Sequence, residues 1–405
     1  MTKWVTKKFD DFFDMLPTNT LSRDKLNDQF GIYQNIHYGD VLIKYPFCLD
    51  CSNNDIPYIN EGENFNKTEL KDGDVVFADT AEDDTVGKCV EVLNVGDKKI
   101  VSGLHTYLCR PKFKMAPGYL GYFLNSDAFH NQLLRYIAGS KVSSVNKTSI
   151  KNTSIFYPES LTEQRRIAGI LSSADGAIAA SEALIEKYRN IKCGLLATLL
   201  QPKEGWKKVK LGECCEVNPK TDLSILRSND EIAFLKMEDV SNDGKITNCN
   251  YLRYCFLAKK GFTTFQNEDV IFAKITPCME NGKGALIRNI KSIVGMGSTE
   301  FHVLRAKENI SIDFIYQISI SKHFRLKAEM QMTGSAGQQR VPTAFLEEYE
   351  ISVPYKNGQP DLAEQRRIAE ILSSVDAKIA AEEKVVEKYK GVKKGLMEEM
   401  MKCEK

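Results

Sequence analysis

Apolar and small side chains recur at alternating steps of three and four residues in two stretches of the chain, residues 161–200 and 362–401. In the first stretch these positions are Ile167, Leu171, Ala174, Ile178, Ser181, Ile185, Tyr188, Leu195 and Leu199. In the second they are Ile368, Leu372, Val375, Ile379, Val386, Tyr389, Leu396 and Met400. Such a heptad seam is typical of helices that pair, although Lys192 and Lys393 interrupt it. The pattern predicts two helices of about 38 residues, each about 57 Å long.

The two stretches are copies of one another. Aligned without gaps at an offset of 201 residues, they are identical at 22 of 40 positions. Weaker similarities precede each copy, since Trp4 and Trp206 stand near the beginning of the two halves and DVVFA at 74–78 resembles DVIFA at 269–273. The chain is therefore a duplicated half-protein. Each helix exposes a narrow apolar stripe that it cannot bury alone, which favours antiparallel pairing of the copies over packing of each helix on its own domain.

The segments outside the helices predict mixed α/β structure. Short runs rich in Val, Ile and Phe are separated by Asn, Gly and Asp turns, and residues 117–137 and 312–332 show helical apolar spacing. We therefore predict an α+β fold with pseudo-twofold internal duplication, in which two globular domains are joined by two long antiparallel coiled-coil helices. The predicted segments are a first domain at 1–160, a central helix at 161–201, a second domain at 202–361 and a C-terminal helix at 362–405.

Composition narrows the class of protein. The contents of 42% apolar and 27% charged residues are ordinary for a globular chain, and a net charge of +1 argues against a non-specific nucleic-acid coat. The 11 cysteines lack a pairing framework, which indicates reduced thiols. Cys48 and Cys51 form a CxxC without a second ligand pair, so we expect no metal site. The acidic N-terminus and the lack of a long apolar run predict a cytoplasmic protein that does not enter membranes.

Catalytic signatures are missing from the sequence. It has no phosphate-binding loop, no nucleophile elbow and no HExxH metal motif. The string from Asn218 to Lys220 matches an amino-methyltransferase motif only in part. Asp361, Glu382 and Lys384 fall at nominal nuclease-motif positions. However, Glu382 would lie about 30 Å along a helix from Asp361, too far for the two carboxylates to share a metal ion. We expect a chain without catalytic residues.

Two polar loops of the second half have the chemistry to read DNA. The loop at 333–342, TGSAGQQRVP, offers donors and no acidic side chain, and its glycines let the backbone approach a partner closely. The loop at 274–283, KITPCMENGK, adds amide, hydroxyl and ammonium groups. The candidate DNA contacts are Gly334, Ser335, Gln338, Gln339, Arg340, Lys274, Thr276, Asn281 and Lys283.

The first half has a loop that corresponds to 333–342, the string GSKVSSVNK at 139–147. Its candidate contacts are Ser140, Lys141, Ser143, Asn146 and Lys147. The first-half counterpart of the other loop, residues 79–88, is acidic instead. Plain solvated turns have similar compositions, but two such loops at equivalent positions favour DNA reading.

Two strings resemble the repeated regions of type I restriction-modification specificity (S) subunits: LTEQRRIAGILSSAD and LAEQRRIAEILSSVD, each followed by a heptad helix. Three further strings resemble that family's target-recognition domains: WKKVKLGECCEV, DVIFAKITPCMENGKGAL and TGSAGQQRVPTAFLEEYEISVP. The first domain departs most, because it lacks the ITPxMxNGK and QQRxP strings. The resemblance implies a non-catalytic DNA specificity subunit. Each target-recognition domain would read one half of a split DNA target, and the helices would set the unread spacer.

The resemblance also implies partners and cofactors that this chain lacks. Double-stranded DNA would be bound together with two methylation subunits, which use S-adenosylmethionine. Translocating restriction subunits, which use Mg²⁺ and ATP, would join this complex. A helical ruler of about 50 Å would span about 15 base pairs. Three alternatives stay open: the recognition subunit of a fused nuclease–methyltransferase system of type IIB, a nuclease or methyltransferase acting alone, and a coiled-coil scaffold that never contacts DNA.

Overall fold

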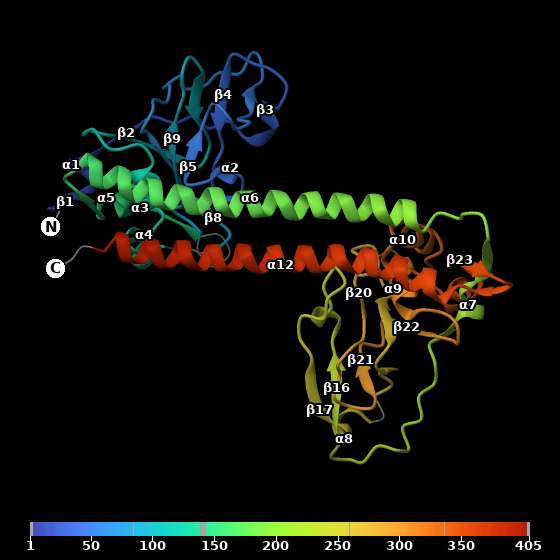
Figure 1. Cartoon of the computed structure of the whole chain (residues 1–405). Coiled ribbons are helices and arrows are strands. Elements are labelled where there is room, and N and C mark those ends of the chain that lie inside the picture. The colour runs from blue at the N-terminus through green and yellow to red at the C-terminus, as the bar shows by residue number, and fades with distance from the viewer. Residues whose placement is uncertain (1–2, 84, 138–142, 259, 336, 403–405) are drawn as a thin grey trace. The chain divides into compact units, whose positions relative to one another are not determined.

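The structure is a computed structural model that describes residues 3–83, 85–137, 143–258, 260–335 and 337–402. The chain divides into two compact units. The first unit combines residues 1–183 with 383–405, and the second comprises residues 184–382. Each unit therefore holds one globular domain together with a part of each long helix (Figure 1).

The globular domain of the first unit is built on two mixed sheets. The larger sheet has the order β2 (Phe13–Leu16), β11 (Thr106–Pro111), β7 (Val75–Ala78), β9 (Cys89–Leu93) and β5 (Cys48–Asp50). The other has the order β10 (Lys99–Ser102), β4 (Tyr33–Ile36), β6 (Tyr58–Ile59) and β3 (Leu26–Asn27). Two further strand pairs are β1 (Trp4–Lys8) with β13 (Ser154–Pro158), and β8 (Thr80–Ala81) with β12 (Ser143–Ser144). The helices are α1 (Phe9–Phe12), α2 (Tyr38–Ile43), α3 (Tyr119–Leu124), α4 (Asp127–Leu133) and α5 (Lys147–Lys151).

The globular domain of the second unit repeats this plan. One sheet has the order β15 (Cys215–Val217), β22 (Phe301–Ala306), β19 (Asp269–Ala273) and β20 (Gly284–Leu286). Another has the order β17 (Asn250–Arg253), β16 (Glu231–Leu235), β21 (Gly295–Gly297) and β18 (Thr263–Phe265). A third joins β14 (Trp206–Lys210), β23 (Glu350–Lys356) and β24 (Gln359–Pro360). The helices are α7 (Leu211–Cys214), α8 (Tyr254–Leu257), α9 (Ile312–Ile320), α10 (Lys322–Glu329) and α11 (Thr343–Glu348).

The duplication predicted from the sequence is confirmed by matching strands and side-chain pairs. The strings DVVFA and DVIFA lead into β7 and form β19, and each lies beside an equivalent antiparallel partner, β11 or β22. The Arg110 guanidinium donates to both carboxylate oxygens of buried Asp74, at 2.8 and 2.7 Å. The Arg305 guanidinium holds Asp269 at the same two distances. From β7 to β11, the equivalent residue of the second domain carries a number 195 higher.

The long helices α6 (Leu161–Leu199) and α12 (Leu362–Met400) each contain 39 residues, close to the predicted length. Their first turns pack into the globular cores. Ile167 and Leu171 of α6 belong to the core of the first unit, among Phe9, Phe77 and Phe123. Ile368 and Leu372 of α12 belong to the core of the second unit, among Phe272, Phe314 and Phe324. These four seam positions therefore stabilise the globular domains.

A buried glutamine also attaches each long helix to its domain. Gln164 accepts a hydrogen bond from the backbone amide of Ala116 at 2.8 Å, and Gln365 accepts one from Ser311 at 2.9 Å. Both amides lie close before a domain helix, α3 or α9. The glutamine of the repeated EQRRI string is thus explained by the need to satisfy an amide that the helix covers.

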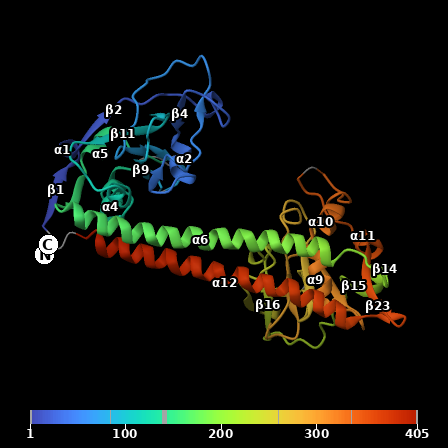
Figure 2. The same cartoon turned by 45° about the horizontal axis from the view of Figure 1, so that its top comes forward.

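Within each unit, the parts of α6 and α12 run antiparallel and side by side (Figures 1 and 2). The two lysines that interrupt the heptad seam make matching ion pairs across it. Lys393 lies 2.6 Å from Asp175 in the first unit, and Lys192 lies 2.6 Å from Asp376 in the second. Both aspartates end the repeated LSSxD string. The two lysines that interrupt the apolar pattern therefore connect α6 and α12 through ion pairs.

The remaining seam positions are not equally buried. Ile178, Ile185, Ile379 and Val386 are buried, whereas Tyr389 is 38% exposed. Tyr188 is half-buried, with the ammonium group of Lys378 5.7 Å from its ring centre. One helix, α6, is long and apolar enough to cross a membrane by length and composition alone, but soluble core helices meet the same criterion. Asp175 and Glu182 on α6 form ion pairs with α12.

Candidate nucleic-acid interface

The two polar loops of the second domain lie side by side, although about 60 residues separate them in the sequence. The amide of Thr276 donates to the carbonyl of Gln339 at 3.0 Å, and the amide of Gln339 donates to the Thr276 hydroxyl at 3.2 Å. The amide of Val341 donates to the carbonyl of Lys274 at 2.9 Å. The candidate contacts of both loops therefore form one surface, which we call the second loop face (residues 274–283, 300, 333–335 and 337–341).

The tip of the 333–342 loop is a tight hairpin. Thr333 and Arg340 exchange backbone hydrogen bonds of 3.0 and 2.8 Å. Gly334 has a φ of 131°, and a Cβ atom on it would lie 2.7 Å from the carbonyl oxygen of Gln338. This position consequently requires glycine. The hairpin leaves Ser335 and Gln338 exposed and Gln339 half-buried.

Arg340 has an acidic partner that the loop sequence did not reveal. Glu300, which directly precedes β22, accepts from the Nη2 and Nε atoms of Arg340 at 2.9 and 3.0 Å. The hydrogen bond from Arg340 lowers the pKa of Glu300 and raises the pKa of Arg340. The expectation of donors without a nearby carboxylate therefore fails for Arg340, which is 43% exposed and oriented by Glu300.

Lys283 is also engaged. Its ammonium group donates to the carbonyl of Met237 at 2.9 Å, as Lys88 does to Leu42 at 2.7 Å in the first domain. The equivalent contact in both domains indicates that these lysines hold a loop in place. Lys274 and Thr276 are half-buried, and Asn281 is exposed. The DNA contacts of all these residues stay predictions.

Two buried side chains beneath the second loop face, His302 and Arg325, were not predicted from the sequence. His302 donates from Nε2 to the carbonyl of Val341 at 2.8 Å, and its Nδ1 accepts from Asn218 at 3.0 Å. Burial lowers the pKa of His302 to about 4, so the ring is neutral at pH 7. Asn218 also accepts from the amide of Val303 at 3.0 Å. The partners are 84 residues apart, so only the fold brings them together.

Arg325 is the second such support. Its buried guanidinium donates to the carbonyls of Met279, Gly282 and Lys283 at 3.3–3.4 Å, and to Ser319 at 2.7 Å. Burial lowers the pKa of Arg325 to about 10. Several hydrogen bonds from one rigid group fix the backbone of the 274–283 loop.

The first domain builds an equivalent surface, the first loop face (residues 79–81, 105 and 143–147). The amide of Val145 donates to the carbonyl of Asp79 at 2.9 Å, and β12 pairs with β8. The predicted contacts Ser140 and Lys141 lie outside the described residues. Asn146 accepts from the amide of Ser149 at 2.8 Å, which caps α5. The Lys147 ammonium lies 5.6 Å from the centre of the Tyr107 ring, and Ser143 is half-buried.

Comparison with known proteins agrees with this duplicated architecture. The family described as "Type I restriction modification DNA specificity domain" matches residues 1–187 and again residues 203–388. The chain belongs to this family. By family, it therefore carries two copies of a type I restriction-modification DNA specificity domain.

Individual proteins that are similar to this chain match it at identities of 24–39%. The specificity subunits of the type I restriction enzymes EcoEI and EcoAI from Escherichia coli are 37% and 39% identical over 152 and 166 residues. These matches cover 37% and 41% of this chain but only 25% and 27% of those proteins, so the chain spans about a quarter of their length. The MjaVIII specificity subunit of Methanocaldococcus jannaschii is 24% identical over 75% of this chain and 73% of its own.

The fold of the specificity chain also matches solved structures. The crystal structure of the type I S subunit from M. genitalium has a TM-score of 0.54 at 13% identity, with 100% of this chain and 97% of that chain covered. A chain from a study of assembly and conformational transition of the type I R-M system has a TM-score of 0.57 at 15% identity, covering 98% of this chain and 97% of that one. At such low identity these likenesses establish the fold alone.

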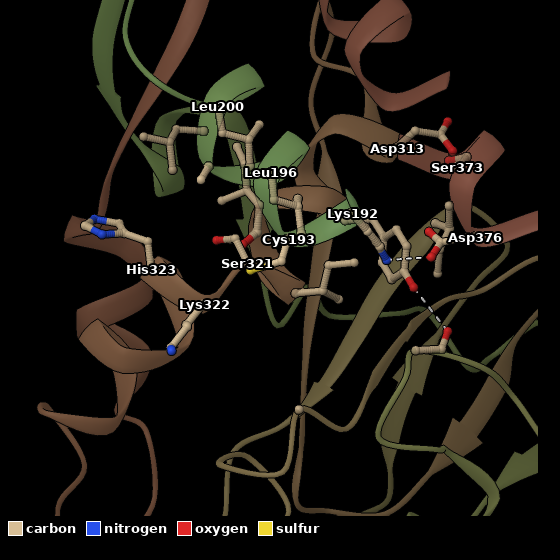
Figure 3. A pocket seen from close by; sticks show the side chains of 18 of the residues that line it. Lys192, Cys193, Leu196, Leu200, Asp313, Ser321, Lys322, His323, Ser373 and Asp376 are labelled. Carbon is tan, nitrogen blue, oxygen red and sulfur yellow. Dashed lines mark hydrogen bonds and ion pairs between the residues drawn. The ribbon is translucent and has the colours of Figure 1, made fainter. Parts of the chain in front are cut away.

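The second unit holds a cavity of about 1720 Å³, which opens between parts of α6, α12, α9 and α10. Cys193 and Leu196 of α6 line one side together with Leu200, which follows the end of this helix. Lys322 and His323 of α10 lie across from them (Figure 3). The Lys192–Asp376 ion pair borders the cavity. Among the residues that the structure describes, no three His, Cys, Asp or Glu side chains are grouped to hold a metal ion.

Proposed function

We propose that this chain gives a type I restriction-modification complex its DNA sequence specificity, with each globular domain reading one half of a bipartite target. The observation that carries the proposal is the pair of loop faces. Both are held by the same backbone hydrogen bonds, yet they present different side chains. A repeated frame with variable surface groups suits two readers of different sequences.

The second loop face offers the chemistry for direct readout. Exposed amides such as Gln338 pair with the edge of adenine, and an oriented guanidinium such as Arg340 pairs with guanine. Backbone amides and Ser335 can bind phosphate and set the register of the domain on the duplex. To contact a base edge, Arg340 would either replace its hydrogen bonds to Glu300 or keep them and be oriented by Glu300 toward the base.

The long helices would set the unread spacer between the half-sites. A helix of 39 residues is about 58 Å long. We expect an insertion of four residues in α6 to lengthen the spacer by one or two base pairs, about 6 Å of helix, without changing either half-site. Altered half-site bases in this variant would contradict the role of a spacer.

The helices also present matching apolar groups to a partner. Ile191 on α6 and Val392 on α12 are equivalent residues, and both side chains are exposed. Exposed apolar residues at duplicated positions suit two copies of one partner. We infer that two methylation subunits dock there and supply S-adenosylmethionine, and that restriction subunits add Mg²⁺ and ATP. We expect this complex to act in the cytoplasm.

The test is long-read detection of methylated adenine in the host genome, with the gene of this chain present and deleted. The proposal predicts that one split motif loses methylation on deletion and regains it when the gene is restored. A matched control restores a Leu171→Asp variant, whose fully buried leucine is replaced, at the same expression level. A methylome that is unchanged by the deletion, in cells that express the methylation subunit, would refute the proposal.

A further inference from the structure

Several hydrogen bonds of the first loop face recur at equivalent positions of the second. The amide of Asp79 donates to the carbonyl of His105 at 3.1 Å, and the amide of Lys274 donates to that of Glu300 at 2.9 Å. Tyr107 donates from its hydroxyl to the carbonyl of Val145 at 3.1 Å, in the place where His302 donates to Val341. His105 is therefore the structural equivalent of Glu300, which orients Arg340.

His105 lies on the first loop face with its own acidic partner. Its Nδ1 atom is 3.2 Å from Oδ1 of Asp79, the residue that takes the place of Lys274. The His105 side chain is 48% exposed and the Asp79 side chain 18% exposed. Tyr38 supports the imidazole with an edge contact, at 5.4 Å between ring centres. The imidazole is thus accessible and held in one orientation by two neighbours.

The backbone of His105 is unusual. Its φ is +53°, a left-handed conformation that costs a side-chain-bearing residue energy and that glycine adopts freely. Stability alone would favour glycine at this turn. A strained residue with an exposed functional side chain, at the position equivalent to the carboxylate that orients Arg340, indicates that the side chain is retained for function.

We propose that His105, oriented by Asp79, is the residue with which the first domain reads a base of its half-site. This inference rests on the proposed function and adds His105 to the contacts that the sequence predicts for the first domain. Because the Asp79 carboxylate accepts from Nδ1, the neutral ring carries its proton on Nδ1 and offers Nε2 as an acceptor. Nε2 suits an exocyclic amino group of adenine or cytosine in the major groove. The first loop face would thus read with acceptors, and the second with the donors of Arg340 and the glutamines.

The test replaces His105 with glycine in the full chain, co-expressed with its methylation subunit, and compares the methylated motifs by long-read sequencing. His105→Gly removes the imidazole and relieves the backbone. We expect an unchanged or higher melting temperature. Methylation at sites with a substituted base at one position of one half-site should rise about tenfold. The other half-site should keep its sequence.

Two variants serve as controls. Asn94→Gly relieves a similar left-handed residue, φ 55°, of the same domain, and should leave the motif unchanged. Glu300→Gln should alter the half-site that His105→Gly leaves intact. The inference is wrong if His105→Gly keeps the wild-type motif, or if it lowers the melting temperature and abolishes methylation, which would make His105 a structural residue. If the wild-type chain directs no motif at all, the proposed function fails instead.

Discussion

The two globular domains share one framework and differ in the side chains that they present on it. At equivalent positions the first loop face carries Asp79 and His105, and the second carries Lys274 and Glu300. The hydrogen bonds from Asp79 to His105 and from Lys274 to Glu300 run between backbone atoms, so they do not depend on the identity of these side chains. Such a domain can therefore change the side chains that it presents without changing how it folds.

The supports beneath the two faces differ as well. Tyr107 and His302 donate to equivalent carbonyls, but only His302 can change its charge under mildly acidic conditions. Arg325 fixes the 274–283 loop through backbone carbonyls. The second face is thus held by polar buried groups, and this difference can be tested.

The largest effect is expected from substitutions that disrupt the hydrophobic core of one unit and leave the other core intact. Leu171 and Leu372 are fully buried, each in the core of one unit. Leu171→Asp should cost the first domain about 4 kcal/mol or more, because a carboxylate is buried and packing is lost, and Leu372→Asp should do the same to the second domain. Limited proteolysis with mapping of the fragments reports which domain opens. Equal opening of both domains in either variant would contradict two separate cores.

The next largest effect is expected in mild acid, which should lower the stability of the second domain through His302. Because burial lowers the pKa of His302 from 6.5 to about 4, the unfolded second domain binds a proton more readily than the folded one. The contribution of His302 to its stability is fully present above pH 6.5 and is lost as the pH drops toward 4, by up to about 3 kcal/mol. Urea unfolding of a Trp4→Phe variant, followed by the fluorescence of Trp206, measures this domain. The His302→Gln variant should lose most of this pH dependence, and an unchanged profile would exclude His302 as its source.

The helix pairing should show a smaller effect of reversed charge. Lys393→Asp places two carboxylates together and should cost about 1–2 kcal/mol. The double variant Lys393→Asp with Asp175→Lys should recover most of the loss in melting temperature. The matched exchange of Lys192 and Asp376 should cost less, because Lys393 also lies 4.5 Å from the ring centre of Phe47. Failure of both double variants to recover would show that these ion pairs do not fix the register.

The smallest effect on stability is expected at the outer helix surface. Ile191→Ser and Val392→Ser should each change the free energy of unfolding by less than about 0.5 kcal/mol, since both side chains are exposed. Each variant should nevertheless lose one of two methylation subunits, measured by native mass spectrometry of the purified complex. Full stoichiometry in the double variant would place the docking surface elsewhere.

The helices and the duplication were predictable because local sequence patterns indicate them: the heptad spacing and the repeated EQRRI string. The loop faces were predictable only as separate loops. Glu300 reaches Arg340, and Asn218 reaches His302, across many residues of chain, and no local pattern encodes such pairs. The left-handed backbone of His105 is equally invisible in a sequence. The lysines that interrupt the seam had a local signal, the aspartate of LSSxD, but their pairing required the antiparallel register.

If each domain reads its own half of the target, the two half-sites can be altered one at a time. The most direct test is long-read methylome sequencing of cells that express the wild-type chain or a Gln338→Ala, Arg340→Ala double variant. We expect the variant to relax or lose the bases of one half-site, while the other half-site and the spacer stay as in the wild type. An identical motif in both strains, or simultaneous loss of both half-sites by a folded variant, would contradict it.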